Sequence, residues 1–220
     1  MPRITHVIWD LDGTLLDTEP SYLLAGKEIA QRYGRVLTPD VRSRMMGRPS
    51  IVAARVFLDE LDILLTPEAF IEAREELLVP LFRACQPMPG AVALTRYLDT
   101  LGIPQAIATS STRRNMGLKV IEHGDWMTTF RAIVTSDDVE HGKPAPDIYL
   151  RAASLIDAPP ESTLVFEDAP LGIDAALAAG MHVVATPEDA YRDLVGHAHV
   201  VIDSLEAFDP APWGLPPLVG

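Results

Sequence analysis

The stretch that decides the fold is HVIWDLDGTLLDTEP, residues 6–20. Residues 4–9, ITHVIW, have the length and the β-branched, apolar character of a short buried strand. Two carboxylates, Asp10 and Asp12, follow this strand directly, project towards similar space and repel one another. The stretch therefore predicts a strand whose carboxyl end meets a partner that compensates the negative charge.

Five further short runs of β-branched or apolar residues follow, at 103–108, 131–135, 163–166, 182–185 and 199–202. None alternates between apolar and polar residues, which is typical of strands covered on both faces. Helical patterns lie between most of these runs, at 90–102, 143–156 and 170–180. Strands that alternate with helices predict an α/β fold, here a Rossmann-like doubly wound parallel sheet.

Residues 18–86 break this alternation. Their helical patterns are SYLLAGKEIAQRYG at 21–34, TPDVRSRMMG at 38–47 and TPEAFIEAREELLVPLFRAC at 66–85. Two of these patterns open with Thr-Pro, a capping residue followed by a proline in the first turn, and no segment here has strand character. We therefore expect an all-α helical cap at 18–86, inserted into a core formed by 1–17 and 87–220.

The composition narrows the classes of function. The 220 residues are 48% hydrophobic, enough for a sizeable core, and the net charge of −13 argues against binding to nucleic acid or to anionic membranes. No apolar run approaches the roughly 18 residues of a membrane span, and the start, MPRITHVIWD, lacks the apolar region of a signal peptide. The single cysteine, Cys85, suits a reducing compartment. We expect a cytoplasmic protein, and a monomer because no long apolar stripe is left over.

Four polar clusters lie at the predicted ends of strands, where a doubly wound sheet binds its ligands. They are Asp10 with Asp12, Thr109 with Ser110 and Ser111, Lys143, and Glu167 with Asp168. Carboxylate oxygens suit Mg²⁺, whereas hydroxyls and a lysine ammonium suit phosphate oxygens. The clusters therefore predict a site for Mg²⁺ and a phosphorylated ligand. A local excess of positive charge there would let an acidic protein bind an anion.

The segments DLDGT (10–14), IATSS (107–111), HGKPAPDIY (141–149) and VFEDAPLGIDAALAAGM (165–181) carry these clusters. In this order and spacing they resemble the haloacid dehalogenase (HAD) superfamily of aspartate-nucleophile phosphotransferases, and the resemblance covers nearly the whole chain. MMGRPS (45–50) and the tail WGLPP (213–217) look most similar to the pseudouridine-5′-phosphatase-like and β-phosphoglucomutase-like subgroup.

The resemblance implies a mechanism in two steps. Asp10 attacks phosphorus and forms an aspartyl-phosphate, which splits one difficult displacement into two easier ones. Asp12 protonates the leaving alcohol and then deprotonates the attacking water. Mg²⁺ is held by the Asp10 carboxylate, the Asp12 backbone carbonyl and Asp168, with Glu167 as a direct or water-mediated ligand.

The resemblance also assigns the groups that bind substrate. Thr109 and Lys143 hold the phosphoryl oxygens, and Lys143 stabilises the charge that develops on them. The adjacent backbone at Ser110 and Ser111 is expected to help bind these oxygens. The cap closes over the site, and Arg48 is the candidate for a contact with the leaving group.

Each cluster alone has a purely structural interpretation. Asp-x-Asp-Gly forms turns, IATSS caps a helix, a lysine before proline is commonly a solvated loop residue, and Glu-Asp suits a helix N-terminus. Only their coincidence at one edge of a sheet favours chemistry.

Several other functions compete with a phosphatase. A dehalogenase needs no second acid, so Asp12 argues against it. A β-phosphoglucomutase-type mutase shares all four motifs but carries a cap histidine soon after the first, which DTEPSYLL (17–24) lacks. The absence of G-x-x-x-x-G-K-[ST] argues against a P-loop kinase. A non-catalytic protein that binds a phosphometabolite on the same fold remains an alternative, although Asp10 and Lys143 are both retained.

The expected function is therefore a Mg²⁺-dependent phosphatase that hydrolyses a small phosphorylated metabolite. A sugar phosphate, a polyol phosphate, a nucleoside monophosphate and a pseudouridine-like phosphate are all compatible with the residues of the predicted cap.

Overall fold

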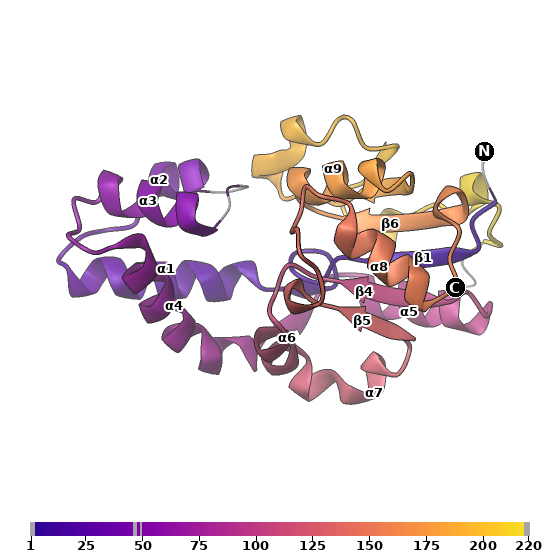
Figure 1. Ribbon diagram of the computed structural model, residues 1–220, viewed down its shortest axis with the longest axis horizontal. Helices are drawn as coiled ribbons and strands as arrows, with labels where there is room; N and C mark the ends of the chain where they lie inside the picture. The colour runs from indigo at the N-terminus through magenta and orange to yellow at the C-terminus, as the bar shows by residue number, and fades with distance from the viewer. Residues whose placement is uncertain (1–2, 46–47, 49, 218–220) are drawn as a thin grey trace. The chain divides into compact units, whose positions relative to one another are not determined.

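The protein divides into two compact units in a computed structural model that describes residues 3–45, 48 and 50–217. One unit combines Met1–Asp17 with Gln86–Gly220, and the other is Thr18–Cys85. The first contains a parallel sheet and the second is helical (Figure 1). The predicted fold class, an α/β sheet with a helical insertion, is confirmed.

The sheet of the core unit has six parallel strands in the order β5-β4-β1-β6-β7-β8. The strands are β1 (His6–Trp9), β4 (Gln105–Ala108), β5 (Ala132–Val134), β6 (Thr163–Glu167), β7 (His182–Ala185) and β8 (Val200–Val201). Each overlaps one of the six runs predicted from the sequence. β1 lies between β4 and β6, so three of the polar clusters follow neighbouring strands.

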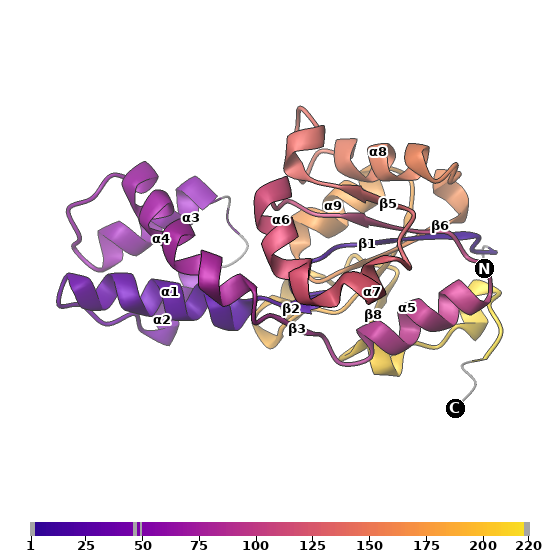
Figure 2. The ribbon, with the colours of Figure 1, turned by 90° about the horizontal axis from the view of Figure 1, so that it is seen from below.

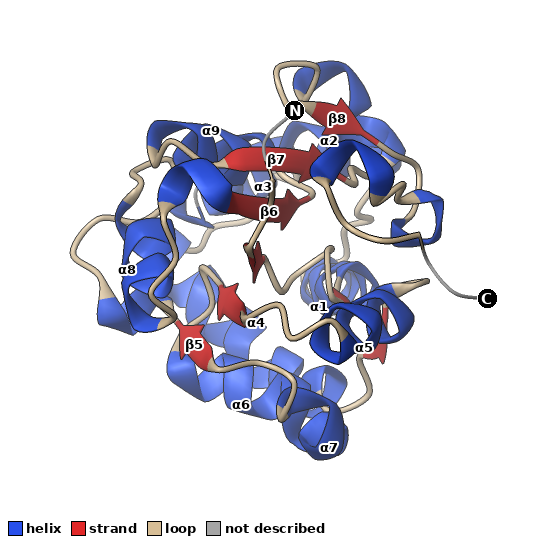
Figure 3. Ribbon diagram, turned by 90° about the vertical axis from the view of Figure 1, so that its right-hand side faces the viewer, coloured by secondary structure: helices blue, strands red, loops and turns tan. Residues whose placement is uncertain are grey.

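Helices cover both faces of this sheet (Figure 3). One face carries α5 (Ala91–Thr100), α6 (Arg113–Val120) and α7 (Gly124–Met127), and the other carries α8 (Asp147–Leu155) and α9 (Pro170–Ala178). Successive residues of a strand point to opposite faces, so Val7 and Trp9 pack in one hydrophobic cluster and Ile8 in the other. This double burial explains why the strands do not alternate in polarity.

Trp9 fixes the end of β1 just before the first carboxylate. Its indole stacks on Phe166 with ring centroids 4.2 Å apart, and its Nε1–H donates to Gln105 Oε1 at 3.0 Å. Gln105 in turn donates from Nε2 to the Thr95 carbonyl at 2.8 Å. The only polar atom of a fully buried ring is thereby satisfied, and strands β4 and β6 are tied to the strand that carries the site.

The helical unit consists of α1 (Glu19–Arg32), α2 (Pro39–Met45), α3 (Ser50–Glu60) and α4 (Pro67–Phe82). As expected for Thr-Pro, the Thr66 hydroxyl caps α4 by accepting from the Ala69 amide at 3.2 Å. The small hydrophobic core of the helical unit includes Phe57 and Phe70, whose ring centroids are 4.5 Å apart. Across the described ranges of the chain, no helix has the length and apolar character that crossing a bilayer requires.

A short antiparallel pair of strands lies where the chain leaves the core unit and where it returns, and it was not expected from the sequence. β2 (Leu16–Asp17) pairs with β3 (Gln86–Pro87), and the Met88 amide donates to the Leu15 carbonyl at 2.9 Å (Figure 2). Strands of two residues have no periodicity, so the sequence predicted only linkers there. The pairing holds the two connections of the helical unit together within the core unit.

A histidine bound to the backbone of β7, His199, should make the stability of the protein depend on pH. The Val183 amide donates to His199 Nδ1 at 3.1 Å, which requires a neutral ring, and partial burial together with His182 lowers the pKa of His199 below its usual value. A lowered pKa means that the unfolded chain binds the proton more readily, so stability is lost as pH falls through about 6.5. We expect His199→Asn, whose Oδ1 can accept the same bond without titrating, to lose about 1–2 °C less in Tm than wild type between pH 7.5 and 5.5. Equal losses would contradict this.

Candidate active site

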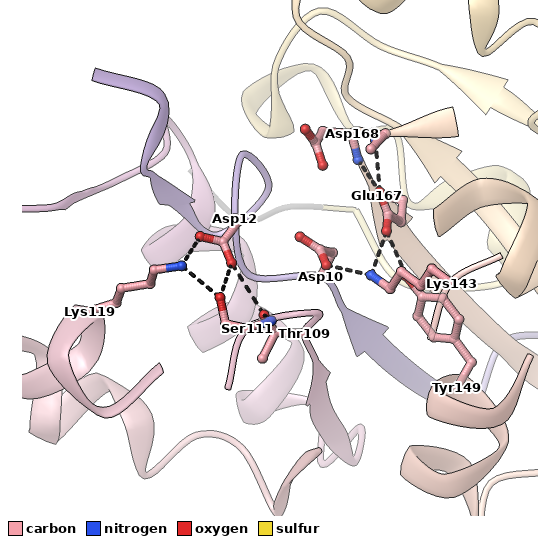
Figure 4. A network of polar contacts seen from close by, with 10 residues as sticks. Asp10, Asp12, Thr109, Ser111, Lys119, Lys143, Tyr149, Glu167 and Asp168 are labelled. Atoms are coloured by element: carbon pink, nitrogen blue, oxygen red, sulfur yellow. Dashed lines mark hydrogen bonds and ion pairs between the residues drawn. The ribbon is translucent and has the colours of Figure 1, made fainter. Parts of the chain in front are cut away.

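The predicted polar clusters meet at the carboxyl ends of β1, β4 and β6 (Figure 4). The Asp10 amide continues the pairing of β1 by donating to the Phe166 carbonyl at 3.0 Å, and the Thr109 amide donates to the Val134 carbonyl at 3.0 Å. Lys143 reaches the same place from the loop between β5 and α8. The topology therefore brings together side chains that are more than 100 residues apart in the sequence.

Asp10 and Lys143 form a buried ion pair. Lys143 Nζ lies 2.5 Å from Asp10 Oδ1, and the side chains are 7% and 8% exposed. Burial raises the pKa of Asp10 to about 7, against the opposing effect of Lys143 and with the charges of Glu167 and Asp12 adding to it. Burial alone would lower the pKa of Lys143, but Asp10 and Glu167 hold it well above its usual value. The lysine therefore stays charged against the carboxylate.

Glu167 is the anchor of this half of the site. Its Oε1 accepts from Lys143 Nζ at 2.7 Å and from the Tyr149 hydroxyl at 3.0 Å. Its Oε2 accepts from the amides of Asp168 and Ala169, both at 2.8 Å. Four donors occupy the roughly four lone-pair sites of a carboxylate, so this buried side chain is fully satisfied.

A glycine in α9 makes room for this arrangement. A Cβ added to Gly172 would lie 1.5 Å from Glu167 Oε1 and 2.0 Å from its Cδ, which no side chain tolerates. The glycine of PLGIDAALAAG therefore serves the carboxylate at the end of β6, not only the packing of helix against sheet.

Tyr149 belongs to the site although the sequence analysis gave it no role. It is fully buried in α8, and Lys143 Nζ lies 4.9 Å from the centroid of its ring. Burial and the neighbouring charge of Glu167 raise the pKa of Tyr149 well above its usual value. It therefore remains a hydrogen-bond donor that holds Glu167 in place. Its position six residues beyond Lys143, within HGKPAPDIY, was the available signal.

Asp12 is held by a second set of donors. Ser111 Oγ and Thr109 Oγ1 donate to Asp12 Oδ2 at 2.9 and 3.2 Å, and Lys119 Nζ forms a short ion pair with Asp12 Oδ1. Lys119 Nζ also donates to Ser111 Oγ at 2.7 Å. Lys119 comes from α6 and was missed by the sequence analysis, which identified no helix there. In Figure 4, Asp12 and Asp10 lie between the two lysines.

The remaining expected binding residues are placed differently. Ser110 is exposed, and its hydroxyl makes no hydrogen bond to the residues that the structure describes. Ser111 and Thr109 direct their hydroxyls to Asp12, and the Ser111 amide donates to Thr109 Oγ1 at 3.0 Å. Arg48 is exposed in the helical unit, where its Nε donates to the Arg44 carbonyl at 2.6 Å. Its contact with a leaving group stays a prediction, and three of its neighbours in MMGRPS lie outside the described residues.

The Asp168 carboxyl group has no cationic partner of its own among the described side chains. Burial raises the pKa of its carboxyl well above the usual value, and the charges of Glu167 and Asp10 raise it further. No hydrogen bond or ion pair joins its carboxylate to the described side chains. Gly13, at φ +82°, lets the backbone pass close to it, because a Cβ there would lie 2.5 Å from Asp168 Oδ2. The carboxylate thus borders a space that only a glycine leaves open.

These features fit Mg²⁺ with few protein ligands. Within the described ranges, no three His, Cys, Asp or Glu side chains form a ready-made metal cage, so the four expected acidic residues do not surround one point. Several protein donors hold the carboxylates of Asp12 and Glu167, whereas the Asp10 carboxylate has Lys143 as its one partner and that of Asp168 has none among the described side chains. Mg²⁺ commonly takes one or two carboxylates, and waters and substrate phosphate supply the remaining ligands.

Comparison with known proteins agrees with this site. Residues 7–186 match the family described as haloacid dehalogenase-like hydrolase. The chain is 43% identical to (DL)-glycerol-3-phosphatase 1, mitochondrial, of Arabidopsis thaliana, over 97% of this chain and 74% of that protein. It is 36% identical to a protein of Drosophila melanogaster described as a probable pseudouridine-5′-phosphatase, over 97% and 95%.

A solved structure shares the architecture. A HAD hydrolase, family IA, variant 3, from Entamoeba histolytica superposes with a TM-score of 0.82 at 26% identity, over 96% of this chain and 98% of that one. The expectation of a HAD-type phosphatase is confirmed by these relatives. With a family match across most of its length and relatives above 40% identity, the chain belongs to the haloacid dehalogenase-like hydrolases of subfamily IA, related to glycerol-3-phosphatases, pseudouridine-5′-phosphatases and β-phosphoglucomutase-like proteins.

Proposed function

We propose that this protein is a Mg²⁺-dependent phosphatase that hydrolyses small phosphorylated metabolites through an aspartyl-phosphate on Asp10. The observation that carries the proposal is the pair of buried lysine–aspartate contacts at the end of β1, Lys143 with Asp10 and Lys119 with Asp12. Polyol phosphates of the glycerol-3-phosphate kind are the first substrate class to test, because the relatives at 42–43% identity carry that activity in their names.

Asp10 and Lys143 carry out the first step. An Asp10 oxygen attacks phosphorus as the bond from phosphorus to the leaving oxygen breaks. The Lys143 ammonium, fixed by Glu167 and Tyr149, orients the nucleophile and lies where it can neutralise phosphoryl oxygens. Bound Mg²⁺, held by Asp10, Asp168 and the Asp12 carbonyl, would offset the repulsion between two anions. The four donors on Glu167 favour an indirect role for it, through Lys143 and the Asp168 backbone.

Asp12 serves both halves of the reaction. It gives its proton to the leaving oxygen in the first step and takes one from the water that hydrolyses the aspartyl-phosphate in the second. At the end of β4, the exposed Ser110 hydroxyl is the group that can meet the phosphoryl oxygens directly, whereas Thr109 and Ser111 direct their hydroxyls to Asp12 beside it. Arg48 remains the cap candidate for the leaving group. A monomer in the cytoplasm is part of this proposal, although one relative is named mitochondrial.

A phosphate-release assay tests this function directly. Pure protein is assayed with glycerol-3-phosphate, a hexitol phosphate, pseudouridine 5′-phosphate and β-glucose 1-phosphate, each with Mg²⁺ and with EDTA. We expect Mg²⁺-dependent release, fastest with the polyol phosphates. Conversion of β-glucose 1-phosphate to the 6-phosphate without net release would identify a mutase. Binding without turnover of any compound would favour a non-catalytic protein.

Asp10→Asn should abolish turnover without unfolding the protein. We expect kcat to fall about 10³-fold or more, because the nucleophile is lost. The raised pKa of Asp10 means that its contribution to stability declines as pH rises through about 7, so in EDTA the Tm of the variant should decrease less than that of wild type between pH 5 and pH 8. Turnover near the wild-type rate would remove Asp10 as the nucleophile.

Fluoride complexes should mimic the phosphorylated aspartate. With Mg²⁺ present, beryllium or aluminium fluoride is expected to inhibit the enzyme and to raise Tm by several degrees at saturation, as a ligand that binds only the folded state does. Asp10→Asn should show neither effect. If neither complex acts on wild type, the covalent route is wrong.

Gly172→Ala tests the anchoring of Lys143 from a distance. The added methyl must displace the Glu167 carboxylate and with it the bonds to Lys143 and Tyr149. We expect kcat/KM to fall about 100-fold, as small displacements of catalytic groups do. Gly117→Ala, also in a helix but with open space at its Cβ, is the matched control and should keep wild-type activity. Equal activities of the two variants would show that the position of Glu167 is unimportant.

A further inference from the structure

We propose that Lys119 is a positioning residue that fixes the carboxylate of Asp12 for its acid–base work; the proposal rests on the proposed phosphatase function. Lys119 stands ten residues beyond Thr109 and outside the four motifs. Of the 18 lysines and arginines in the chain only three are lysines, Lys27, Lys119 and Lys143. Two of these three are buried at the site, each against one aspartate of DLDGT.

The geometry holds both oxygens of the Asp12 carboxylate. Lys119 Nζ pairs with Oδ1, and the hydroxyls of Ser111 and Thr109 donate to Oδ2. Lys119 Nζ also donates to Ser111 Oγ at 2.7 Å, which orients that hydroxyl towards the carboxylate. Hydroxyls both donate and accept, so Ser111 and Thr109 can keep Asp12 in place when it carries a proton.

Lys119 and Asp12 differ in their exposure to solvent, and this difference separates their roles. The Lys119 side chain is 0% exposed, whereas that of Asp12 is 25% exposed. A fully buried ammonium carries a desolvation penalty that only close, well-directed acceptors offset. Asp12 thus meets solvent and substrate on one side and is fixed from the protein interior on the other. Lys119 acts through Asp12 and is not itself placed to meet the leaving group.

A purely structural role for Lys119 would be to tie α6 to the loop after β1. The two roles differ in their dependence on the leaving group. An alkyl phosphate releases a poor leaving group that needs a proton from Asp12, whereas p-nitrophenolate leaves without one. Loss of positioning should therefore harm the alkyl substrate selectively, whereas a general loosening of the site should harm both substrates alike.

Lys119→Met tests this, since methionine keeps the length and removes the charge. kcat/KM is compared for glycerol-3-phosphate and p-nitrophenyl phosphate, because it reports the steps up to formation of the aspartyl-phosphate. We expect a fall of about 100-fold for the alkyl phosphate and less than about 5-fold for the aryl phosphate. The second step still needs Asp12 as base, so p-nitrophenol should appear in a burst followed by slow turnover.

Arg114→Met is the matched control, because Arg114 is exposed on the same helix and its loss should leave both substrates unaffected. Equal losses for the two substrates, or wild-type kinetics in Lys119→Met, would overturn the proposal. A crystal structure of Lys119→Met gives a readout without activity. A rotated Asp12 carboxylate supports positioning and an unmoved one contradicts it. If wild type hydrolyses nothing, the phosphatase function fails, and that structure still decides the role of Lys119.

Discussion

The site depends on one electrostatic constraint, which is that Asp10, Asp12, Glu167 and Asp168 gather at the ends of two adjacent strands. Parallel pairing of β1 with β6 forces this, since Trp9 is in register with Phe166 and the acids follow both. Burial raises the pKa of both Asp10 and Asp168, and the charges of the neighbouring carboxylates raise it further. The protein offsets part of this charge with two buried lysines and leaves the rest near Asp168 for a bound cation.

The fold and most of the site could be predicted because their signals are local. Non-alternating runs identify strands covered on both faces, and the rule that ligands bind at strand ends then brings Asp10, Thr109 and Glu167 together. Two-residue strands and the polar helix α6 have no such signal, so β2, β3 and α6 were missed. Lys119 was lost with α6, and Tyr149 looked like an ordinary apolar position of a helix. The partner of a side chain is decided by packing between elements, which periodicity does not encode.

The four acidic residues also fall into two groups, those held by protein donors and those left to meet a cation, and residue type alone does not reveal which is which. The resemblance left open whether Glu167 binds the ion directly or through water, and it gave Asp12 a ligand role only through its backbone carbonyl. In the structure the Glu167 carboxylate accepts four hydrogen bonds and the Asp12 carboxylate accepts three donors from the β4 and α6 side. Each of these carboxylates is satisfied by the protein itself. Asp10 has Lys143 as its one partner and Asp168 has none among the described side chains, so these two carboxylates are the ones best suited to share a cation with a phosphate.

The same geometry explains why lysine, and not arginine, is the positively charged residue at the two buried positions. In the part of the chain that the structure describes, the exposed ion pairs formed by a lysine or an arginine use arginine, as in Arg35 with Asp62 and Arg113 with Asp138, where a planar guanidinium keeps its spare donors in water. At the buried positions a guanidinium would bring five N–H groups, and several would lack an acceptor. The ammonium of Lys143 fits between Asp10 and Glu167, and that of Lys119 fits between Asp12 and Ser111. Two of the three lysines of this chain therefore occupy the two places where the cation must be compact and fully enclosed, whereas the third, Lys27, is exposed in α1.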